Sequence, residues 1–375
     1  MSENLFSKYR PHLINEVFGH EKIVKELKKR FKENSIPHAI LLSGFTGTGK
    51  TTLIRIIAKS ILCQNKDAEG NSCNKCEMCQ TIDKEKLSNI YFELNASNIG
   101  IDDMREIDES AGKRVLGKYT TKIFVIDEMQ ELSSKNKAAE KNILKILEKP
   151  SDNVYFILGT MDASKVSTAI KNRCVHYKLS PLSFQDITKY LEYICKSENI
   201  KIDTVDKANT LITIAQNSSG SMRTAVSYLE RVIYSDIWNA EELLKELDII
   251  SDANAIIIIN YILNGDIRAF EYEINEEVLK KIKYLLMLYY KLICGVTLNG
   301  WQQGQIKEIN CKDRNDLFIL FETINQLATF PYVYTDLIEY HFLQVVNKIK
   351  KRKEDIEQLS NQVYTVIEKP RRTKN

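Results

Sequence analysis

Residues 44–51, GFTGTGKT, place glycines, a lysine and a threonine in the order G-x-x-x-x-G-K-[ST]. Glycines let backbone N–H groups turn inward around an anion, and the N-terminus of a following helix adds positive potential. Lys50 is expected to reach the β- and γ-phosphates of a nucleotide, and Thr51 to bind Mg²⁺. The stretch therefore predicts a phosphate-binding loop, since AILLS before it reads as a strand and TTLIRIIAKSIL after it as a helix.

Carboxylates stand at the end of a second strand-like run. The segment 122–130, KIFVIDEMQ, is apolar up to Asp127 and Glu128. In a parallel sheet this places both carboxylates at the carboxyl edge, where ligands bind. Asp127 is expected to hold Mg²⁺ through water and Glu128 to polarise an attacking water. Thr160, at the end of a third such run, is placed to hydrogen-bond the γ-phosphate or that water.

Four of the eight cysteines lie close together in the sequence. Their spacing is C-x₉-C-x₂-C-x₂-C, formed by Cys63, Cys73, Cys76 and Cys79. Four thiolates close a tetrahedral Zn²⁺ site with no open position, so the site is predicted to be structural. The segment has few apolar residues, and the metal would supply its folding free energy. The isolated cysteines are expected in the core or in loops: Cys174, Cys195, Cys294 and Cys311.

The elements that must position these groups fit a soluble chain of several domains. The sequence has 375 residues, is 43% hydrophobic and 27% charged, and carries a net charge of +3, which does not by itself indicate nucleic-acid binding. Its lysine clusters, 25–30 and 348–353, favour solvated helix faces over nucleic-acid contacts. The N-terminus does not resemble a signal peptide and the longest apolar run is too short for a bilayer. We therefore expect a cytoplasmic protein with reduced thiols.

Strand and helix patterns alternate over residues 36–180, which predicts a parallel sheet covered by helices. Further motifs accompany the two described above: SKYRPHLINEVFGHEKI at 7–23, LKILEKP at 144–150, LGTMD at 158–162, NRC at 172–174 and GSMRTAVS at 220–227. With these motifs the chain resembles the γ/τ subunit of the bacterial DNA polymerase III clamp loader, an AAA+ ATPase of DNA replication. The resemblance covers most of the chain.

The resemblance implies an α/β fold with an AAA+ P-loop nucleotide domain, an inserted zinc module, a small helical lid and an all-α collar. The expected domains are 1–181 for nucleotide binding, with the zinc module at about 62–82, 182–242 for the lid and 243–348 for the collar that joins subunits. Residues 349–375 are charged, and we expect them to be a disordered tail.

The resemblance also implies roles for single residues. Arg173 would act in trans as a finger on the ATP of a neighbouring subunit, and Arg223 would contact the γ-phosphate of its own subunit, so the catalytic set becomes Lys50, Asp127, Glu128, Thr160, Arg173 and Arg223. Structural Zn²⁺ on the four cysteines and Mg²⁺ on Thr51 and Asp127 complete the cofactors. ATP would be bound by Tyr9, Arg10, Val17, Gly44, Thr46, Gly47, Thr48, Gly49, Lys50, Thr51, Thr52 and Arg223.

The implied function is that of an ATPase motor subunit. ATP binding would open a sliding clamp and load it on primed DNA, and hydrolysis would release both. The expected partners are other loader subunits in a hetero-oligomeric ring, with five subunits in all, the sliding clamp, and primed-template DNA held through its phosphates. No membrane partner and no polymerase active site are expected.

Some positions depart from the family pattern. The motif DEMQ stands where DEVH is usual, Asn172 replaces a serine, and residues 98–100 lack the family's basic side chains, although Arg105 is retained. The departures leave open a divergent or phage-encoded member, which would work in the host cytoplasm. Two alternative functions also stay open: another AAA+ DNA motor such as a branch-migration helicase, and a non-hydrolysing scaffold subunit of the ring.

Overall fold

The computed structural model describes residues 4–84, 88–112, 119–135, 137–148, 151, 153–247, 249–272, 274–298, 300–311, 313–327 and 335–367. The chain divides into two compact units between Ala240 and Glu241. This division falls two residues before the predicted boundary between lid and collar. None of the described helices is long and apolar enough to cross a membrane.

The first unit is built on a five-stranded parallel sheet, which confirms the predicted α/β class. The strand order is β2-β3-β4-β1-β5. The strands are β1 (Ala39–Ser43), β2 (Tyr91–Asn95), β3 (Lys122–Asp127), β4 (Val154–Thr160) and β5 (Val175–Lys178). Every residue of β1 is buried, as expected of a central strand covered on both faces. The register pairs Ser43 with Thr160, and Asn95 with Asp127, so the polar strand ends lie along one edge.

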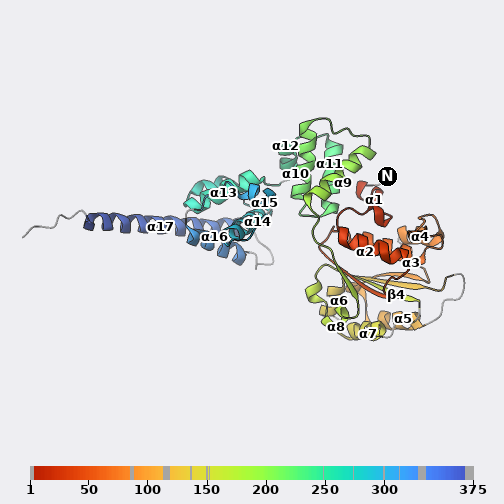
Figure 1. Ribbon diagram of the computed structural model, residues 1–375. Coiled ribbons are helices and arrows are strands. Elements are labelled where there is room, and N and C mark those ends of the chain that lie inside the picture. The colour runs from red at the N-terminus through yellow and green to blue at the C-terminus, as the bar shows by residue number, and fades with distance from the viewer. Residues whose placement is uncertain are drawn as a thin grey trace, which may run out of the picture. The chain divides into compact units, whose positions relative to one another are not determined.

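Helices cover both faces of this sheet (Figure 1). On one face lie α2 (Glu21–Lys32), α3 (Lys50–Leu62) and α4 (Glu77–Asp83). On the other lie α5 (Ile101–Gly112), α6 (Met129–Lys135), α7 (Lys137–Glu148) and α8 (Thr168–Lys171). Alternate side chains of one strand serve the two cores: Ile40 and Leu42 pack with α2 and α3, whereas Leu41 packs with α7. Short helices complete this part: α1 (Leu5–Lys8), η1 (Ile14–Glu16), η2 (Ala96–Asn98) and η3 (Ala163–Lys165).

The helical segment after the sheet has three helices, α9 (Phe184–Ser197), α10 (Val205–Asn217) and α11 (Met222–Ser235). Each begins after a hydroxyl residue that accepts a backbone N–H of the first turn, namely Ser183, Thr204 and Ser221. Apolar side chains at helical spacing are buried between them, including Leu191, Leu211 and Leu229. The start of α11 is held on the phosphate loop, because the N–H of Met222 donates to the carbonyl of Gly47 at 3.0 Å.

The second unit is helical. It contains α12 (Ala240–Glu246), which begins at the division, α13 (Asp252–Asn264), η4 (Ile267–Glu271), α14 (Glu276–Ile293), α15 (Gly300–Ile306), α16 (Arg314–Leu327) and α17 (Thr335–Ile367). One hydrophobic core joins α13, α14, α16 and α17. It includes Ile259, Leu285, Leu320 and Phe342, all fully buried.

The predicted disordered tail from residue 349 is wrong as far as Ile367, because α17 continues to that residue. Ile349 is fully buried, and Arg352 forms an ion pair with Asp316 at 3.0 Å. These contacts anchor a segment whose charge alone suggested disorder. Residues 368–375 lie outside the described part of the chain, as do Lys149 and Pro150 of the 144–150 motif.

One glycine fixes how the cysteine-bearing segment packs on α2. Gly70 has φ +79°, and a Cβ atom there would lie 2.2 Å from the carbonyl oxygen of Phe31. Gly70→Ala should lower the free energy of unfolding by about 1–3 kcal/mol, since it adds left-handed strain to a backbone clash. Chemical denaturation would measure this. Gly100→Ala is the control, because its nearest atom is an Asp103 oxygen at 3.4 Å. Equal stability of the two variants would contradict the prediction.

Candidate functional site

The loop between β1 and α3 has the backbone that a phosphate cradle requires. Gly47 and Gly49 have φ of +78° and +100°, which side chains with a Cβ rarely adopt. Gly49 is the N-cap of α3, and no side chain of the described residues caps that helix start. The N–H groups of the first turn are therefore available to an anion, and the helix dipole favours one there.

Lys50 points back into this loop. Its ammonium donates to the carbonyl of Gly44 at 2.7 Å and to that of Phe45 at 3.1 Å. Burial lowers the pKa of Lys50, while the nearby carboxylates of Asp127 and Glu128 act to raise it. The amino group is thus already at the cradle, and phosphate oxygens can replace the two carbonyls as its acceptors.

The two carboxylates and Thr160 form one connected set at the strand ends. A carboxylate oxygen of Asp127 accepts the N–H of Glu128 at 2.8 Å, and Glu128 has φ +58°. The hydroxyl of Thr160 donates to the side-chain oxygen of Gln130 at 2.6 Å, and the Gln130 amide donates to Glu128. Gln130 was missed by sequence reasoning, although it stands where the DEMQ motif departs from the family.

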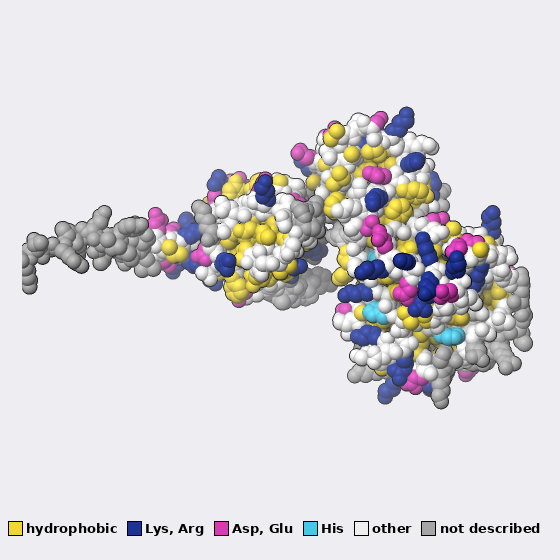
Figure 2. Space-filling view, in the orientation of Figure 1, with side chains coloured by type: hydrophobic (Ala, Val, Ile, Leu, Met, Phe, Trp, Pro, Cys, Tyr) yellow, Lys and Arg dark blue, Asp and Glu magenta, His cyan; other side chains and the backbone are white. Residues whose placement is uncertain are grey.

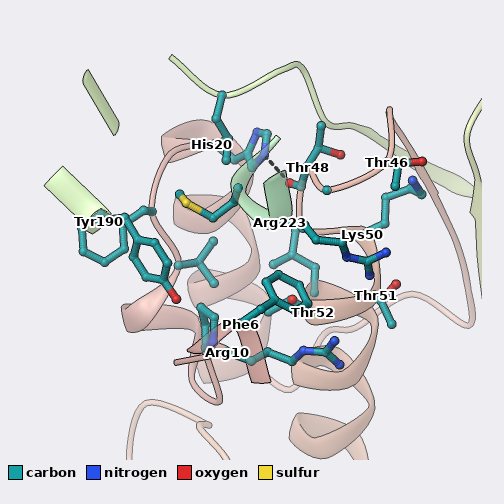
Figure 3. Close-up of a pocket in the computed structure, with 18 of the residues that line it drawn as sticks. Phe6, Arg10, His20, Thr46, Thr48, Lys50, Thr51, Thr52, Tyr190 and Arg223 are labelled. Atoms are coloured by element: carbon teal, nitrogen blue, oxygen red, sulfur yellow. Dashed lines mark hydrogen bonds between the residues drawn. The ribbon is translucent and has the colours of Figure 1, made fainter. Parts of the chain in front are cut away.

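A cavity of about 220 Å³ opens beside the loop (Figure 3). Most of the predicted nucleotide ligands line it: Arg10, Val17, Thr46, Gly47, Thr48, Gly49, Lys50, Thr51, Thr52, Asp127, Glu128 and Arg223. Gly44, Thr160 and Arg173 do not line it. Tyr9 also lies elsewhere, because its hydroxyl donates to Glu198 at 2.7 Å.

Eight residues of the cavity wall were not predicted: Phe6, Pro11, Phe18, His20, Leu53, Leu182, Tyr190 and Met222. Apart from Leu53, which lies on α3, they come from the N-terminal segment and from the lid, which are far apart in the sequence. Phe18 and Tyr190 pack edge to face with ring centroids 5.0 Å apart and form an apolar end to the cavity. Such a wall suits a flat heteroaromatic base.

The ring of Phe6 lies between two arginines of the cavity. The guanidinium carbons of Arg10 and Arg223 are 5.2 and 5.1 Å from the ring centroid. Both distances are within the range of a cation–π contact. The short helix α1 that carries Phe6 is tied to the lid, since the N–H of Leu5 donates to Glu230 at 2.9 Å. The N-terminal segment therefore contacts both Arg223 and the lid helix that carries it.

Arg173 lies in a different place. Its guanidinium donates to the carbonyl of Ala169 at 2.8 Å and pairs with Glu148. It lines a second cavity, of about 300 Å³, together with His38, Cys174 and others. The geometry gives this arginine no role in the first cavity of its own chain.

The four cysteines converge as predicted. All their sulfur atoms lie within 4.8 Å of one another. Two of these separations, Cys76 to Cys63 and Cys76 to Cys79, are 4.0 and 3.5 Å. A tetrahedral Zn²⁺ with Zn–S bonds of about 2.3 Å needs sulfur atoms about 3.8 Å apart. The donor set and its spacing therefore fit zinc with no open position.

Backbone N–H groups favour the thiolate form of one of these cysteines, which is the form that binds a metal. The N–H groups of Lys75 and Cys76 lower the pKa of Cys73 to about 6, because they stabilise the thiolate. Burial instead raises the pKa of Cys63. The other four cysteines do not join the cluster.

Loss of one ligand tests the cluster. Cys76→Ser should weaken zinc binding by at least about tenfold, since three thiolates leave the tetrahedron open. Zinc bound per chain after dialysis against a weak chelator would be measured, together with the melting temperature, which should fall. Cys294→Ser is the control, because Cys294 is exposed in the second unit. Full zinc retention by Cys76→Ser would disprove this metal site.

His20 makes the phosphate-loop packing sensitive to pH. Its ring Nε2 lies 3.0 Å from the carbonyl oxygen of Thr48. Burial lowers the pKa of His20 below 6.5, although the hydrogen bond to Thr48 and the charge of Asp186 act to raise it. Below that value the unfolded chain binds more protons, so stability should be full above about pH 6.5 and fall as the pH drops through the folded pKa. His20→Gln keeps an N–H donor without a titrating group. The stability difference between the two proteins should shrink toward acid pH, and a pH-independent difference would contradict this.

Comparison with known proteins agrees with these features. Residues 19–183 match the family model described as DNA polymerase III, delta subunit. The chain is 30% identical over 338 residues to DNA polymerase III subunit gamma of Buchnera aphidicola subsp. Baizongia pistaciae (strain Bp), covering 85% of this chain and 89% of that protein. It is 28% identical to subunit gamma/tau of Mycoplasma genitalium, but spans 53% of that protein.

Among solved structures, the chain is similar to RuvB of Thermotoga maritima, with a TM-score of 0.48 and 17% identity, covering 77% of this chain and 86% of that one. The similarity in sequence to the gamma subunits extends over both units of the chain. Their identity and coverage show that this chain belongs to the gamma/tau family of DNA polymerase III clamp-loader subunits, with the expected AAA+ fold and four-cysteine cluster.

Proposed function

We propose that this chain hydrolyses ATP as the motor subunit of a sliding-clamp loader. ATP binding would open the clamp and grip primed DNA, and hydrolysis would release both. The observation that carries the proposal is the shared cavity, where a phosphate loop, two carboxylates and the arginine of a lid helix meet in one chain. A nucleotide there touches the elements that a motor has to move.

The residues of the cavity divide the work of hydrolysis. Lys50 and the loop N–H groups hold the phosphates. Oxygens of Thr51 and Asp127 suit Mg²⁺, which would neutralise charge on the β- and γ-phosphates. Glu128 polarises the attacking water, and Thr160 acts on Glu128 through Gln130 rather than from the cavity wall.

Two arginines make the nucleotide a switch. To contact the γ-phosphate, Arg223 either leaves the ring of Phe6 or keeps that contact as well. The new contact connects the lid to the phosphate loop. Arg173 leaves Glu148 and reaches the ATP of a neighbouring subunit, where its planar fork stabilises charge on the transferring phosphoryl group. Hydrolysis removes the charge that both arginines hold, so lid and neighbour are released together.

The second unit is proposed as the collar of the hetero-oligomeric ring. Large apolar side chains are exposed on it, including Tyr290, Leu292, Phe318 and Leu343. Figure 2 shows hydrophobic side chains gathered on the visible face of this unit. Exposed apolar surface of this kind is typical of a subunit interface.

DNA contacts are proposed to be to phosphates and independent of sequence. Residues 98–100 do not offer the family's basic side chains, and the side chain of Arg105 lies outside the described residues. Lysines and arginines also gather along α2 (Figure 2). Several of them are paired there, as Arg30 with Glu26 at 2.9 Å and Lys32 with Glu69 at 2.9 Å, which favours a solvated face. We place the protein in the bacterial cytoplasm or in that of a phage host.

Steady-state ATP turnover tests the proposal. The chain would be assembled with its ring partners and measured with clamp and primed DNA, each alone and together. Turnover should rise most with both. Arg173→Ala should lower the stimulated rate by about 10²–10³-fold, because a donor to the transferring phosphoryl group is lost. Lys165→Ala, an exposed cation of the same region, should have no effect.

Other outcomes decide between the alternatives. Stimulation by DNA alone, with no effect of clamp or of Arg173→Ala, would indicate a different DNA motor. Tight ATP binding without turnover in the complete ring would indicate a scaffold subunit.

A further inference from the structure

A buried lysine outside the nucleotide cavity joins three parts of the first unit. Lys59 lies on α3, nine residues after Lys50, and its side chain is only 1% exposed. Burial of an ammonium group is costly unless charged and polar partners surround it. Its position is therefore determined by those partners.

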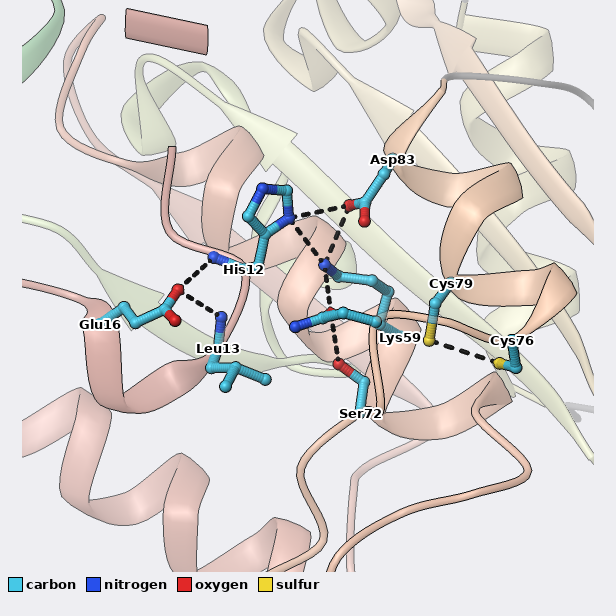
Figure 4. A network of polar contacts seen from close by, with 9 residues as sticks. His12, Leu13, Glu16, Lys59, Ser72, Cys76, Cys79 and Asp83 are labelled. Atoms are coloured by element: carbon cyan, nitrogen blue, oxygen red, sulfur yellow. Dashed lines mark hydrogen bonds and ion pairs between the residues drawn. The ribbon is translucent and has the colours of Figure 1, made fainter. Parts of the chain in front are cut away.

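Three side chains surround the ammonium of Lys59 (Figure 4). It pairs with Asp83 at 2.9 Å and donates to the side-chain oxygen of Asn74 at 3.0 Å. The ring Nδ1 of His12 lies 3.3 Å from it. The same Nδ1 is 3.4 Å from Asp83, so the three charged or titratable groups form one cluster.

Two of these partners belong to the cysteine-bearing segment. Asn74 stands between Cys73 and Cys76, and its oxygen also accepts the hydroxyl of Ser72 at 3.1 Å. Asp83 is the last residue of α4, the helix that has Cys76 as its N-cap and carries Cys79. A metal on the four sulfur atoms would fix both Asn74 and Asp83 relative to Lys59.

The third partner belongs to the wall of the nucleotide cavity. His12 directly follows Arg10 and Pro11, which both line that cavity. Its segment is held further by Glu16, whose carboxylate accepts the N–H of His12 at 2.7 Å and that of Leu13 at 3.1 Å. A change in the position of His12 is thus transmitted to Arg10, which lies against Phe6.

We propose that Lys59 is a positioning residue that couples the cysteine cluster to nucleotide binding. With the cluster closed by metal, Asn74 and Asp83 hold Lys59, and Lys59 holds His12 and the cavity wall. Without metal, the pair partners move and the wall loosens. Metal therefore raises nucleotide affinity, and by linkage nucleotide raises metal affinity by the same factor. This inference rests on the proposed ATP and zinc binding.

The test is the dissociation constant for ATP with Mg²⁺, measured by calorimetry on the full chain, zinc-loaded and after treatment with a zinc-selective chelator. Zinc removal should weaken ATP binding of the natural chain by about 5–150-fold, the usual size of coupling between two sites. Lys59→Met should bind ATP more weakly even with zinc, and zinc removal should then change its affinity by less than about twofold.

Two further variants separate coupling from folding. His12→Ala keeps the pair of Lys59 and Asp83, so it should retain zinc yet lose the zinc dependence of ATP affinity. Ser60→Ala is the matched control on the same helix. Within the described part of the chain, the Ser60 hydroxyl donates to the carbonyl of Gly70 in the cysteine segment at 3.1 Å and is not hydrogen-bonded to His12. This variant should behave like the natural chain.

Each other result has a definite meaning. The coupling is overturned if ATP affinity does not depend on zinc in the natural chain, or if His12→Ala and Lys59→Met remain as sensitive to zinc as the natural chain. Either result leaves the proposed ATPase untouched. A natural chain that binds no ATP in either state overturns the proposed function as well. The readout is binding alone, so a failure of clamp loading does not affect it.

Discussion

The burial of one helix, α3, is the constraint on which the first unit depends. Ten of its thirteen residues are buried, and they include Lys50 and Lys59 as well as the apolar side chains against the sheet. The helix begins in the phosphate loop and is followed at once by Cys63. Because a packed helix moves as a rigid rod, its two ends cannot be arranged independently. The cavity beside the phosphate loop and the cysteine cluster are therefore both held by α3.

The lid depends on the same support through contacts that are individually small. Met222 is bonded to Gly47, and a Cβ at Gly47 would come within 2.0 Å of the Ser221 hydroxyl. The start of α11 thus packs closely on the loop, with Arg223 one residue further along. The N-terminal segment completes the enclosure, because Phe6 stands between Arg10 and Arg223. A ligand that attracts Arg223 competes with a cation–π contact worth about 0.5–2 kcal/mol, so an anionic ligand can displace the ring of Phe6 at a small cost in free energy.

At the strand ends, Thr160 does not line the cavity and is connected to it by hydrogen bonds. Thr160 is fully buried, and among the described residues its hydrogen-bond connection to Glu128 runs through Gln130. Gly159 allows this arrangement, because a Cβ at that position would lie 2.3 Å from a carboxylate oxygen of Asp127. Gln130, which departs from the family's usual motif, thereby connects Glu128 and Thr160, which both keep to the family pattern. A substitution in such a network is tolerated when the new side chain meets the same donors and acceptors.

The sequence by itself determined the sheet class, the phosphate loop with Lys50 and Thr51, the carboxylates and the four-cysteine cluster, because each is encoded within a short stretch whose local geometry follows from residue type and spacing. Tertiary structure decided what distant segments contribute. It turned Tyr9 away toward Glu198, brought Phe6, His20 and Tyr190 to the cavity, and set Lys59 among His12, Asn74 and Asp83. It also made residues 349–367 helical. Long-range packing and the need to pair buried charge fix these positions, and neither is visible in local periodicity.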